Sequence, residues 1–397
     1  MKSFKVIRDP LHGDIGLSRL ELDLLDTPQM QRLRRVKQNG FCFLVYPAMN
    51  STRFEHSLGV MHLAGILCER LDLSADETAV VRAAGLLHDV GHTPFSHSTE
   101  KALKSRGYGH EEVSVKLVKT SPISEVLTEH SIDPGVVSNL VLGEGRFGGI
   151  ISSQIDVDKM DYLIRDAYYA GVAYGVTDIE RVMQCVRLSR KGLFIEEDGL
   201  EAVESLLVNR NLMYQTVYRH HTKRIGEAMF HHALEYLLEE GLSTDELIQL
   251  DDVALTSLMR ADKGYAGRVA GRLDSRRLHK TVLCEKIMEM DDEFRERLVD
   301  KPSVLEEEIV EDMGLSLGEL IVDYPEIKMS EFKVNVMSDA GLKPIDEVSS
   351  LARSLEESEQ DRLEFNIYCD PLVVEKSPEI SLEKYIHYKQ TRIESFI

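Results

Sequence analysis

Histidine and aspartate side chains stand next to each other in one apolar stretch of the chain, where they could bind a metal ion. The stretch reads GLLHDVGHTPFSH, so His88 and Asp89 follow an apolar run, and His92 and His97 come soon after. Neutral imidazole nitrogens and carboxylate oxygens are good ligands for Mn, Fe, Ni, Zn or Mg ions. His88 and Asp89 therefore offer half of a metal site, although a lone pair of this kind is more often a capping aspartate beside a surface histidine.

Two further segments add donors and cations to this pair. The segment TRFEHSLG contains His56, with Arg53 three residues before it, a spacing at which two side chains can face one cleft from the same helix. The segment IDVDKMDYLIRD contains Asp158, with Lys159 beside it. Taken alone, such an acidic run is typical of a solvated helix face, so its chemical meaning depends on the other segments.

The elements that must position these donors are helices. Apolar residues recur at spacings of three and four through residues 1–240, as in Val80, Ala84 and Leu87 before the His-Asp pair. Ser74 and Glu77 have the spacing of a capping box, which predicts a helix start at this point.

The chain after residue 240 divides into two predicted segments. Residues 241–315 continue the helical pattern with an acidic surface, and residues 316–397 contain period-two alternation. Alternation at 332–337 and 363–368 predicts two strands, 320–322 is a candidate third strand, and apolar spacing at 348–355 predicts a short helix. We expect a mainly α fold whose small C-terminal α/β subdomain supports the core or mediates oligomerisation, with a soft boundary between the segments.

Composition excludes several classes of protein. The 397 residues include 47 Lys and Arg against 68 Asp and Glu, a formal charge of −21, which disfavours nucleic acid as a partner. No run of about 18 apolar residues predicts a membrane helix, and no signal peptide precedes the charged residues at the N-terminus. The five cysteines form no CxxC pair, so we expect a cytoplasmic protein without disulfides or a cysteine zinc site.

Together, in the order H…HD…D, these segments resemble the HD-domain phosphohydrolase superfamily, named for its His-Asp doublet. They resemble more closely its deoxynucleoside triphosphate triphosphohydrolases, the dGTPase-like and SAM-and-HD-domain branch. The likeness runs from Lys5 to about Tyr218 and includes DPLHG, DTPQMQRLR, VYP and RFEHSLGV. It implies an HD-domain helical core at 1–240 and a hydrolase that releases deoxynucleoside and tripolyphosphate from dNTPs.

The resemblance also implies a metal site and a catalytic centre. One divalent ion, of unknown identity among Mn, Fe, Ni, Zn and Mg, would be held by four ligands: His56, His88, Asp89 and Asp158. Such a donor set leaves room in an octahedral shell for a phosphate oxygen and a water that attacks the α-phosphate in line. The expected catalytic residues are His92, His97, His110 and Glu111. Among these, His110 would protonate the departing nucleoside oxygen while Glu111 orients its ring.

Cations are expected to hold the triphosphate of the substrate. By resemblance, Arg53 would grip the α-phosphate, and Lys159 and Arg210 would hold the β- and γ-phosphates, where fixed cations offset developing charge. The chain departs from the family pattern nearby, because Tyr214 and His221 stand where the eukaryotic enzymes have histidine and lysine. How the chain binds the triphosphate, and which base it prefers, are therefore left open.

Polar and aromatic residues are expected to hold the sugar. Gln38 and Asp166 resemble the residues that hydrogen-bond the 3′-hydroxyl, and Tyr162 and Tyr218 resemble those that stack against the sugar. A tyrosine pressed on C2′ would exclude a ribose hydroxyl and so select deoxynucleotides.

A regulatory nucleotide site is the least developed expectation. Its residues would be Lys5, Val6, Asp26, Gln31 and Arg34, which match parts of the activator site that joins subunits in the family. The segment that should supply basic contacts there is acidic instead, FIEEDG at 194–199, and would repel a triphosphate. We expect any activation by dGTP or GTP to be rewired, and a homo-oligomer, either a dimer or a tetramer.

Two other functions compete with dNTP hydrolysis. The same metal site could act on a nucleoside monophosphate, a cyclic nucleotide or another phosphate ester, because a fold does not fix a substrate. The core could instead serve a slow nucleotide-sensing scaffold. Three candidate cations favour a polyphosphate, and a complete set of ligands favours an enzyme over a scaffold.

Overall fold

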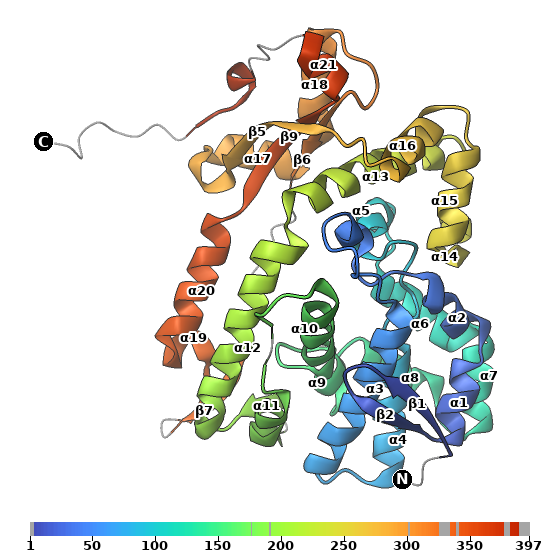
Figure 1. Cartoon of the computed structure of the whole chain (residues 1–397). Coiled ribbons are helices and arrows are strands. Elements are labelled where there is room, and N and C mark those ends of the chain that lie inside the picture. Colours follow the sequence, from blue (N-terminus) through green and yellow to red (C-terminus); the bar gives the residue numbers. More distant parts are fainter. Residues whose placement is uncertain are drawn as a thin grey trace, which may run out of the picture.

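The computed structural model of the chain describes residues 4–175, 177–189, 192–300, 302–324, 334–338, 341–376 and 382–388. Figure 1 shows a mainly helical molecule with small sheets, which confirms the predicted fold class. Among the described residues, no helix is both long and apolar enough to cross a membrane.

The first part of the chain folds into helices that surround one large apolar core, except that α5 and α13 pack in a second apolar cluster. These helices are α1 (Arg19–Leu25), α2 (Pro28–Arg32), α3 (Arg53–Arg70), α4 (Ala75–Leu87), α5 (His97–Lys104), α6 (His110–Thr120), α7 (Pro122–Glu129), α8 (Pro134–Val141), α9 (Gly148–Ile151), α10 (Val157–Ala170), α11 (Ile179–Cys185), α12 (Leu200–Met213) and α13 (His221–Glu239). The predicted capping box is confirmed, since Ser74 accepts from the Glu77 amide and Glu77 accepts from the Ser74 amide. Helix α4 therefore begins where the sequence predicts.

The later helices are α14 (Thr244–Gln249), α15 (Asp252–Ala261), α16 (Tyr265–Asp274), α17 (Asp292–Asp300), α18 (Pro302–Met313), α19 (Ile345–Val348), α20 (Ser350–Asp361) and α21 (Pro371–Lys376). Helices α19 and α20 replace the single short helix expected at 348–355. Helix α20 runs beside α12 of the first part (Figure 1).

Three small sheets complete the fold. One is the antiparallel hairpin β1 (Lys5–Asp9) and β2 (Gly13–Leu17), and the second has the order β3 (Val186–Ser189), β4 (Gly192–Ile195), β7 (Asn335–Ser338) and β8 (Gly341–Pro344). The third has the order β5 (Lys280–Lys286), β9 (Glu364–Cys369) and β6 (Leu320–Asp323), with antiparallel pairing throughout.

The strands correct part of the expected organisation. Strands β6 and β9 lie where strands were predicted, and β7 covers the described part of the predicted strand at 332–337, whose first two residues lie outside the described ranges. Strands β1 to β4 interrupt a region expected to be helical, and β5 lies in the expected helical extension. Because β4 pairs with β7, the C-terminal segment completes a sheet of the first part. The three-domain division stays a prediction.

Candidate metal and catalytic site

Three helices bring the four predicted metal ligands together. Helix α3 carries His56 in its first turn, α4 ends at His88 and Asp89, and α10 carries Asp158 in its first turn. His56 Nε2 lies 2.9 Å from an Asp158 oxygen and 3.6 Å from an Asp89 oxygen. His88 Nε2 lies 3.3 Å from Asp89 and 3.6 Å from Asp158. The donors converge within the distances that one shared cation requires.

The surroundings of His88 show that this cluster fits a cation. Its Nδ1 lies 2.9 Å from the Gly85 carbonyl, which can only accept, so Nδ1 carries the hydrogen and Nε2 presents a lone pair. That Nε2 is buried, hydrogen-bonds to none of the described residues, and faces the Asp89 and Asp158 carboxylates. A lone pair facing two carboxylates is unfavourable unless a positive charge lies between them. A divalent metal ion supplies such a charge, as does a proton on Nε2, since burial alone would lower the pKa of His88 but Asp89 and Asp158 outweigh it and raise that pKa.

A second layer of charge orients His56. Its Nδ1 lies 2.8 Å from Asp161, whose carboxylate also accepts from Arg165 at 2.8 and 3.0 Å and lies 2.6 Å from His12 Nε2. A carboxylate behind a ligating histidine fixes the ring and strengthens its donor nitrogen. Burial alone would raise the pKa of Asp161, but Arg165 and the two histidines hold that pKa well below its usual value.

Asp161 had no role in the sequence reasoning, although two signals pointed to it. It lies one helical turn after Asp158 and one turn before Arg165, so all three can share a face of α10. A Cβ placed on Gly59 would overlap the Asp161 carboxylate, so glycine at this position of α3 lets the two helices approach.

Arg53 links the metal ligands to the loop that follows them. Its Nη1 lies 2.5 Å from Asp89 and its Nε donates to Ser96 Oγ at 2.9 Å. Burial alone would raise the pKa of Asp89, but Arg53 and the neighbouring histidines hold it well below its usual value. Phe95 and Ser96 have φ angles of 57° and 52°, so this loop is held in a conformation that side chains rarely adopt.

The three candidate catalytic histidines lie together, but their carboxylate partner differs from the prediction. His92 stacks on His110 with ring centroids 4.2 Å apart, and His97 and His110 each place Nδ1 2.7 Å from one oxygen of Glu100. Glu111 is exposed, because it follows His110 on α6 and points about 100° away around the helix. Glu100 therefore holds the His110 ring in this structure, while Glu111 lines the cavity and its catalytic role stays a prediction.

Burial and two neighbouring side chains set the pKa of His92. Burial, Arg53 and His110 lower its pKa well below the usual value, so the ring is neutral. Ligand atoms of Asp89, His92 and His110 lie within 4.8 Å of one another, which makes them a second candidate ligand group.

A cavity of about 370 Å³ opens onto this cluster. Of the residues expected to bind substrate, it is lined by Gln38, Arg53, Lys159, Tyr162, Asp166 and Tyr218. Asp166 accepts from Asn39 and from Tyr218, each at 2.7 Å, while burial raises its pKa to about 6. The Gln38 side-chain oxygen is buried and accepts from none of the described residues, so it is available to a ligand.

Arg210 is the exception among the expected substrate residues. It is only 4% exposed and is absent from the described lining of the cavity. Its guanidinium lies 4.7 Å from the ring centre of Tyr214 and 4.0 Å from a Glu359 oxygen. Tyr214 itself lines the cavity. In this structure Arg210 is thus a packing residue behind the cavity wall, because Tyr214 and Glu359 hold it there.

The expected regulatory residues lie on two elements near the N-terminus. Lys5 and Val6 are exposed on β1, and Asp26 follows α1. The Arg34 Nε donates to the Gln31 side chain at 2.9 Å. The regulatory role of these residues stays a prediction. The acidic segment at 194–199 is partly compensated, since Arg187 and Arg181 form ion pairs with its side chains.

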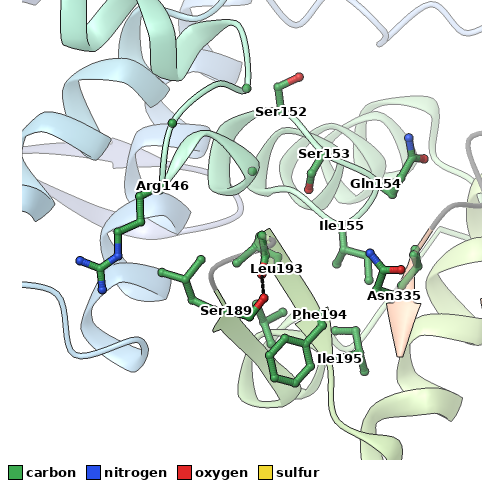
Figure 2. A pocket seen from close by; sticks show the side chains of 17 residues that line it. Arg146, Ser152, Ser153, Gln154, Ile155, Ser189, Leu193, Phe194, Ile195 and Asn335 are labelled. Carbon is green, nitrogen blue, oxygen red and sulfur yellow. Dashed lines mark hydrogen bonds between the residues drawn. The ribbon is translucent and has the colours of Figure 1, made fainter. Parts of the chain in front are cut away.

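A larger cavity of about 910 Å³ lies between the β3–β4 hairpin and the loop before α10 (Figure 2). Its walls are mostly glycine, serine and apolar side chains, and Arg146 is the only charged side chain among the described lining residues. The described lining residues offer no cluster of metal ligands or paired histidines for hydrolysis, so size alone does not mark the active site.

Comparisons with known proteins agree with this geometry. Residues 53–166 match the HD domain family and residues 177–394 match the HD associated region. An uncharacterised protein of Methanocaldococcus jannaschii is 37% identical over 92% of this chain and 79% of its own length. A deoxynucleoside triphosphate triphosphohydrolase SAMHD1 homolog of Dictyostelium discoideum is 32% identical over 63% of this chain and 51% of its own length.

Two solved structures share the whole fold. A hypothetical protein from Aquifex aeolicus has a TM-score of 0.78 and 32% identity, covering 94% of this chain and 98% of that one. A phosphohydrolase from Bacteroides thetaiotaomicron has a TM-score of 0.74 and 25% identity, covering 92% and 99%.

Proposed function

The chain belongs to the HD-domain phosphohydrolases with an HD associated region, and from this premise we propose that it hydrolyses dNTPs to deoxynucleoside and tripolyphosphate. The main support for this proposal is that one cavity is lined by Asp89 and Asp158 of the His-Asp cluster and by Arg53, Lys159, Gln38 and Asp166. Relatives named as deoxynucleoside triphosphate triphosphohydrolases support the same substrate class.

The side chains have distinct roles in this reaction. A divalent ion held by the four donors would polarise the α-phosphate and lower the pKa of a coordinated water. Arg53 fixes Asp89 and presents its remaining N–H groups to the phosphate. His110, held by Glu100 through Nδ1, keeps Nε2 for the leaving nucleoside oxygen.

The sugar end of the cavity favours a deoxynucleoside. Asp166 and the Gln38 oxygen can accept from a 3′-hydroxyl. The Tyr162 and Tyr218 rings lie edge to face with centroids 6.4 Å apart and narrow the space beside it. A ribose 2′-hydroxyl would have to displace one of these rings, which is the basis of the proposed selectivity.

The position of Arg210 favours a second candidate function. Three cations were expected to bind phosphate. Arg53 and Lys159 line the cavity, whereas Arg210 lies behind its wall. Lys159 donates to the Ser153 carbonyl at 2.8 Å and to Asp156 at 2.9 Å, so it must turn to reach a phosphate. Hydrolysis of a nucleoside monophosphate, a cyclic nucleotide or another phosphate ester needs fewer cations and fits this arrangement.

Product analysis tests the proposal. The purified protein is incubated with each dNTP and NTP and with Mn or Mg, with and without GTP or dGTP, and the products are separated by anion exchange. Deoxynucleoside plus tripolyphosphate, lost in His88→Ala, is the expected result. Turnover of monophosphates or cyclic nucleotides alone would favour the second candidate.

We further propose one ion per chain and a homo-oligomeric state, both carried from the family resemblance. Elemental analysis gives the ion count, and two equivalents would assign the second ligand group a metal-binding role. Light scattering with and without added nucleotide gives the oligomeric state and shows whether an activator changes it.

A further inference from the structure

Four residues form a partition between the catalytic cavity and a neighbouring cavity of about 280 Å³. His97 and Ser98 on α5 and Lys223 and Glu227 on α13 line both cavities. Lys223 donates to one Glu227 oxygen at 2.8 Å, and Ser98 donates to the other at 2.7 Å. The Glu227 carboxylate is therefore fixed at the cavity wall with one hydrogen bond to each of its oxygens.

Three consecutive residues show where this partition lies along the cavity. The Gln38 carbonyl lies 3.4 Å from Arg53 at the metal end, and the Asn39 side chain donates to Asp166 at the sugar end. A Cβ on Gly40 would overlap Ser98 and lie 3.2 Å from Glu227. Because consecutive Cα atoms are about 3.8 Å apart, Gly40 is at most about 7 Å beyond Gln38. Gly40 thus places the partition next to the residues that contact the sugar, and His97 places it beside the catalytic histidines.

The charge at the partition suits an uncharged, polar group. Lys223 and Glu227 compensate each other, and the nearby Arg224 is paired with Asp323 at 2.8 Å. Burial alone would lower the pKa of Lys223, but Glu227 raises it above its usual value, so the lysine stays charged. At the other end, a divalent ion held by His56, His88, Asp89 and Asp158 would attract phosphate. A phosphate group therefore gains more at the metal end, which leaves the partition for the base.

We infer that Glu227 and Lys223 read the edge of the nucleobase and select guanine. This inference rests on the proposed dNTP hydrolysis. Guanine presents two adjacent donors, N1–H and the 2-amino group, beside the O6 acceptor. A carboxylate has about four acceptor positions on its two oxygens and an ammonium has three donors, so Glu227 can accept from both guanine groups while Lys223 donates to O6.

The other bases match this pair less well. Thymine offers one N–H donor on this edge, and adenine and cytosine each offer one amino group beside a ring acceptor. Each of these three bases would therefore make one hydrogen bond fewer to the Glu227 carboxylate than guanine does. A hydrogen bond to a charged group changes binding by about tenfold to a hundredfold, which sets the expected preference for dGTP.

The test measures kcat and KM for all four dNTPs with wild-type protein and Glu227→Gln. The amide keeps the size of the side chain but has one acceptor oxygen, so kcat/KM for dGTP should fall about tenfold to a hundredfold, mainly through KM. The values for the other dNTPs should change much less. Glu235→Gln is the matched control, because Glu235 lies on the same helix, pairs with Arg106 at 2.7 Å and is absent from the described lining of both cavities.

The outcomes separate the inference from the proposed function. Hydrolysis of all four dNTPs with a ranking that Glu227→Gln does not change would overturn the base-reading role and leave dNTP hydrolysis standing. Failure of wild-type protein to hydrolyse any dNTP would overturn both. If Glu227→Gln does not fold, Glu227→Asp serves instead, because it keeps the charge but withdraws the carboxylate, and it should also lose dGTP selectively.

Discussion

Replacing Asp161 with asparagine tests the charge network behind the metal site. The carboxylate accepts two hydrogen bonds from Arg165 and contacts His12 and His56, and the Arg165 side chain is fully buried. Asparagine has nearly the same shape, but it carries no charge and keeps one acceptor oxygen. The substitution therefore removes the charge that compensates Arg165 and leaves the packing in place.

The expected loss of stability follows from these contacts. Arg165 would keep Asp9, at 2.9 Å, as its remaining carboxylate partner in this network. Breaking a buried ion pair by removing one partner costs about 3–5 kcal/mol. Asparagine can keep at most one of the two Arg165 hydrogen bonds, and losing the other, at about 1.5–3 kcal/mol, accounts for part of this figure. The metal affinity should also fall about tenfold to a hundredfold, because His56 loses the group that orients it.

The assay is urea unfolding of the metal-free protein in chelator, followed by titration of each refolded variant with Mn. Asp245→Asn is the control, because Asp245 is 71% exposed and pairs with Lys116 at 3.4 Å. An exposed ion pair of this kind contributes at most about 1 kcal/mol to the free energy of unfolding. Measuring without metal separates the cost of the charge network from the contribution of the ion.

The pH dependence gives a second check with a definite sign. The pKa of Asp161 is lowered in the folded protein, so its contribution to stability is full above the unfolded value of about 3.9 and declines as pH falls through the folded value. The difference between wild type and Asp161→Asn should shrink below about pH 4, as the carboxylate is protonated. A loss at neutral pH under about 1 kcal/mol would refute the argument, because Arg165 would then be compensated elsewhere.

Three further predictions concern other residues of the site. Glu100→Gln should lower kcat about tenfold to a hundredfold because it releases His110, whereas Glu111→Gln should leave turnover nearly unchanged; steady-state kinetics of the two variants compares them. His88→Ala should lower metal affinity by at least about a hundredfold while the helices are retained, which elemental analysis and circular dichroism measure. Arg210→Ala should lower the melting temperature with little change in KM, since Arg210 packs behind the cavity wall; a raised KM with unchanged melting would instead assign it to phosphate.

Local signals explain what the sequence predicted well. The Ser74 capping box and the apolar spacing before His88 act over a few residues, and both correspond to the observed α4. The donors on α3, α4 and α10 were found because each belongs to a short motif. Neither motif spacing nor periodicity contains the distances between helices, so the convergence at His88 Nε2 appears only in three dimensions.

Tertiary contacts explain what the sequence missed. Strand β5 reads KTVLCEK and lacks the alternation of apolar and polar residue types that Phe365, Asn366 and Ile367 give to β9. Glu100 acts on His110 from another helix, whereas Glu111 was favoured because it is adjacent in sequence. Adjacent residues on a helix point in different directions, and sequence proximity is a poor guide to side-chain partners there.

The meeting of His56 and His88 follows from where α3 and α4 cross. A Cβ on Gly85 would lie 3.4 Å from the backbone of Met61, so α3 and α4 approach closely at this point. A short loop joins the two helices, which makes them antiparallel. His56 precedes Met61 on α3 and His88 follows Gly85 on α4, so both lie on the same side of the crossing. At about 1.5 Å per residue they are about 7 Å and 5 Å beyond it, a difference that side-chain length can cover. The two histidines can share an ion because of where the helices cross, a point marked by the contact of Gly85 with Met61, 24 residues earlier in the chain.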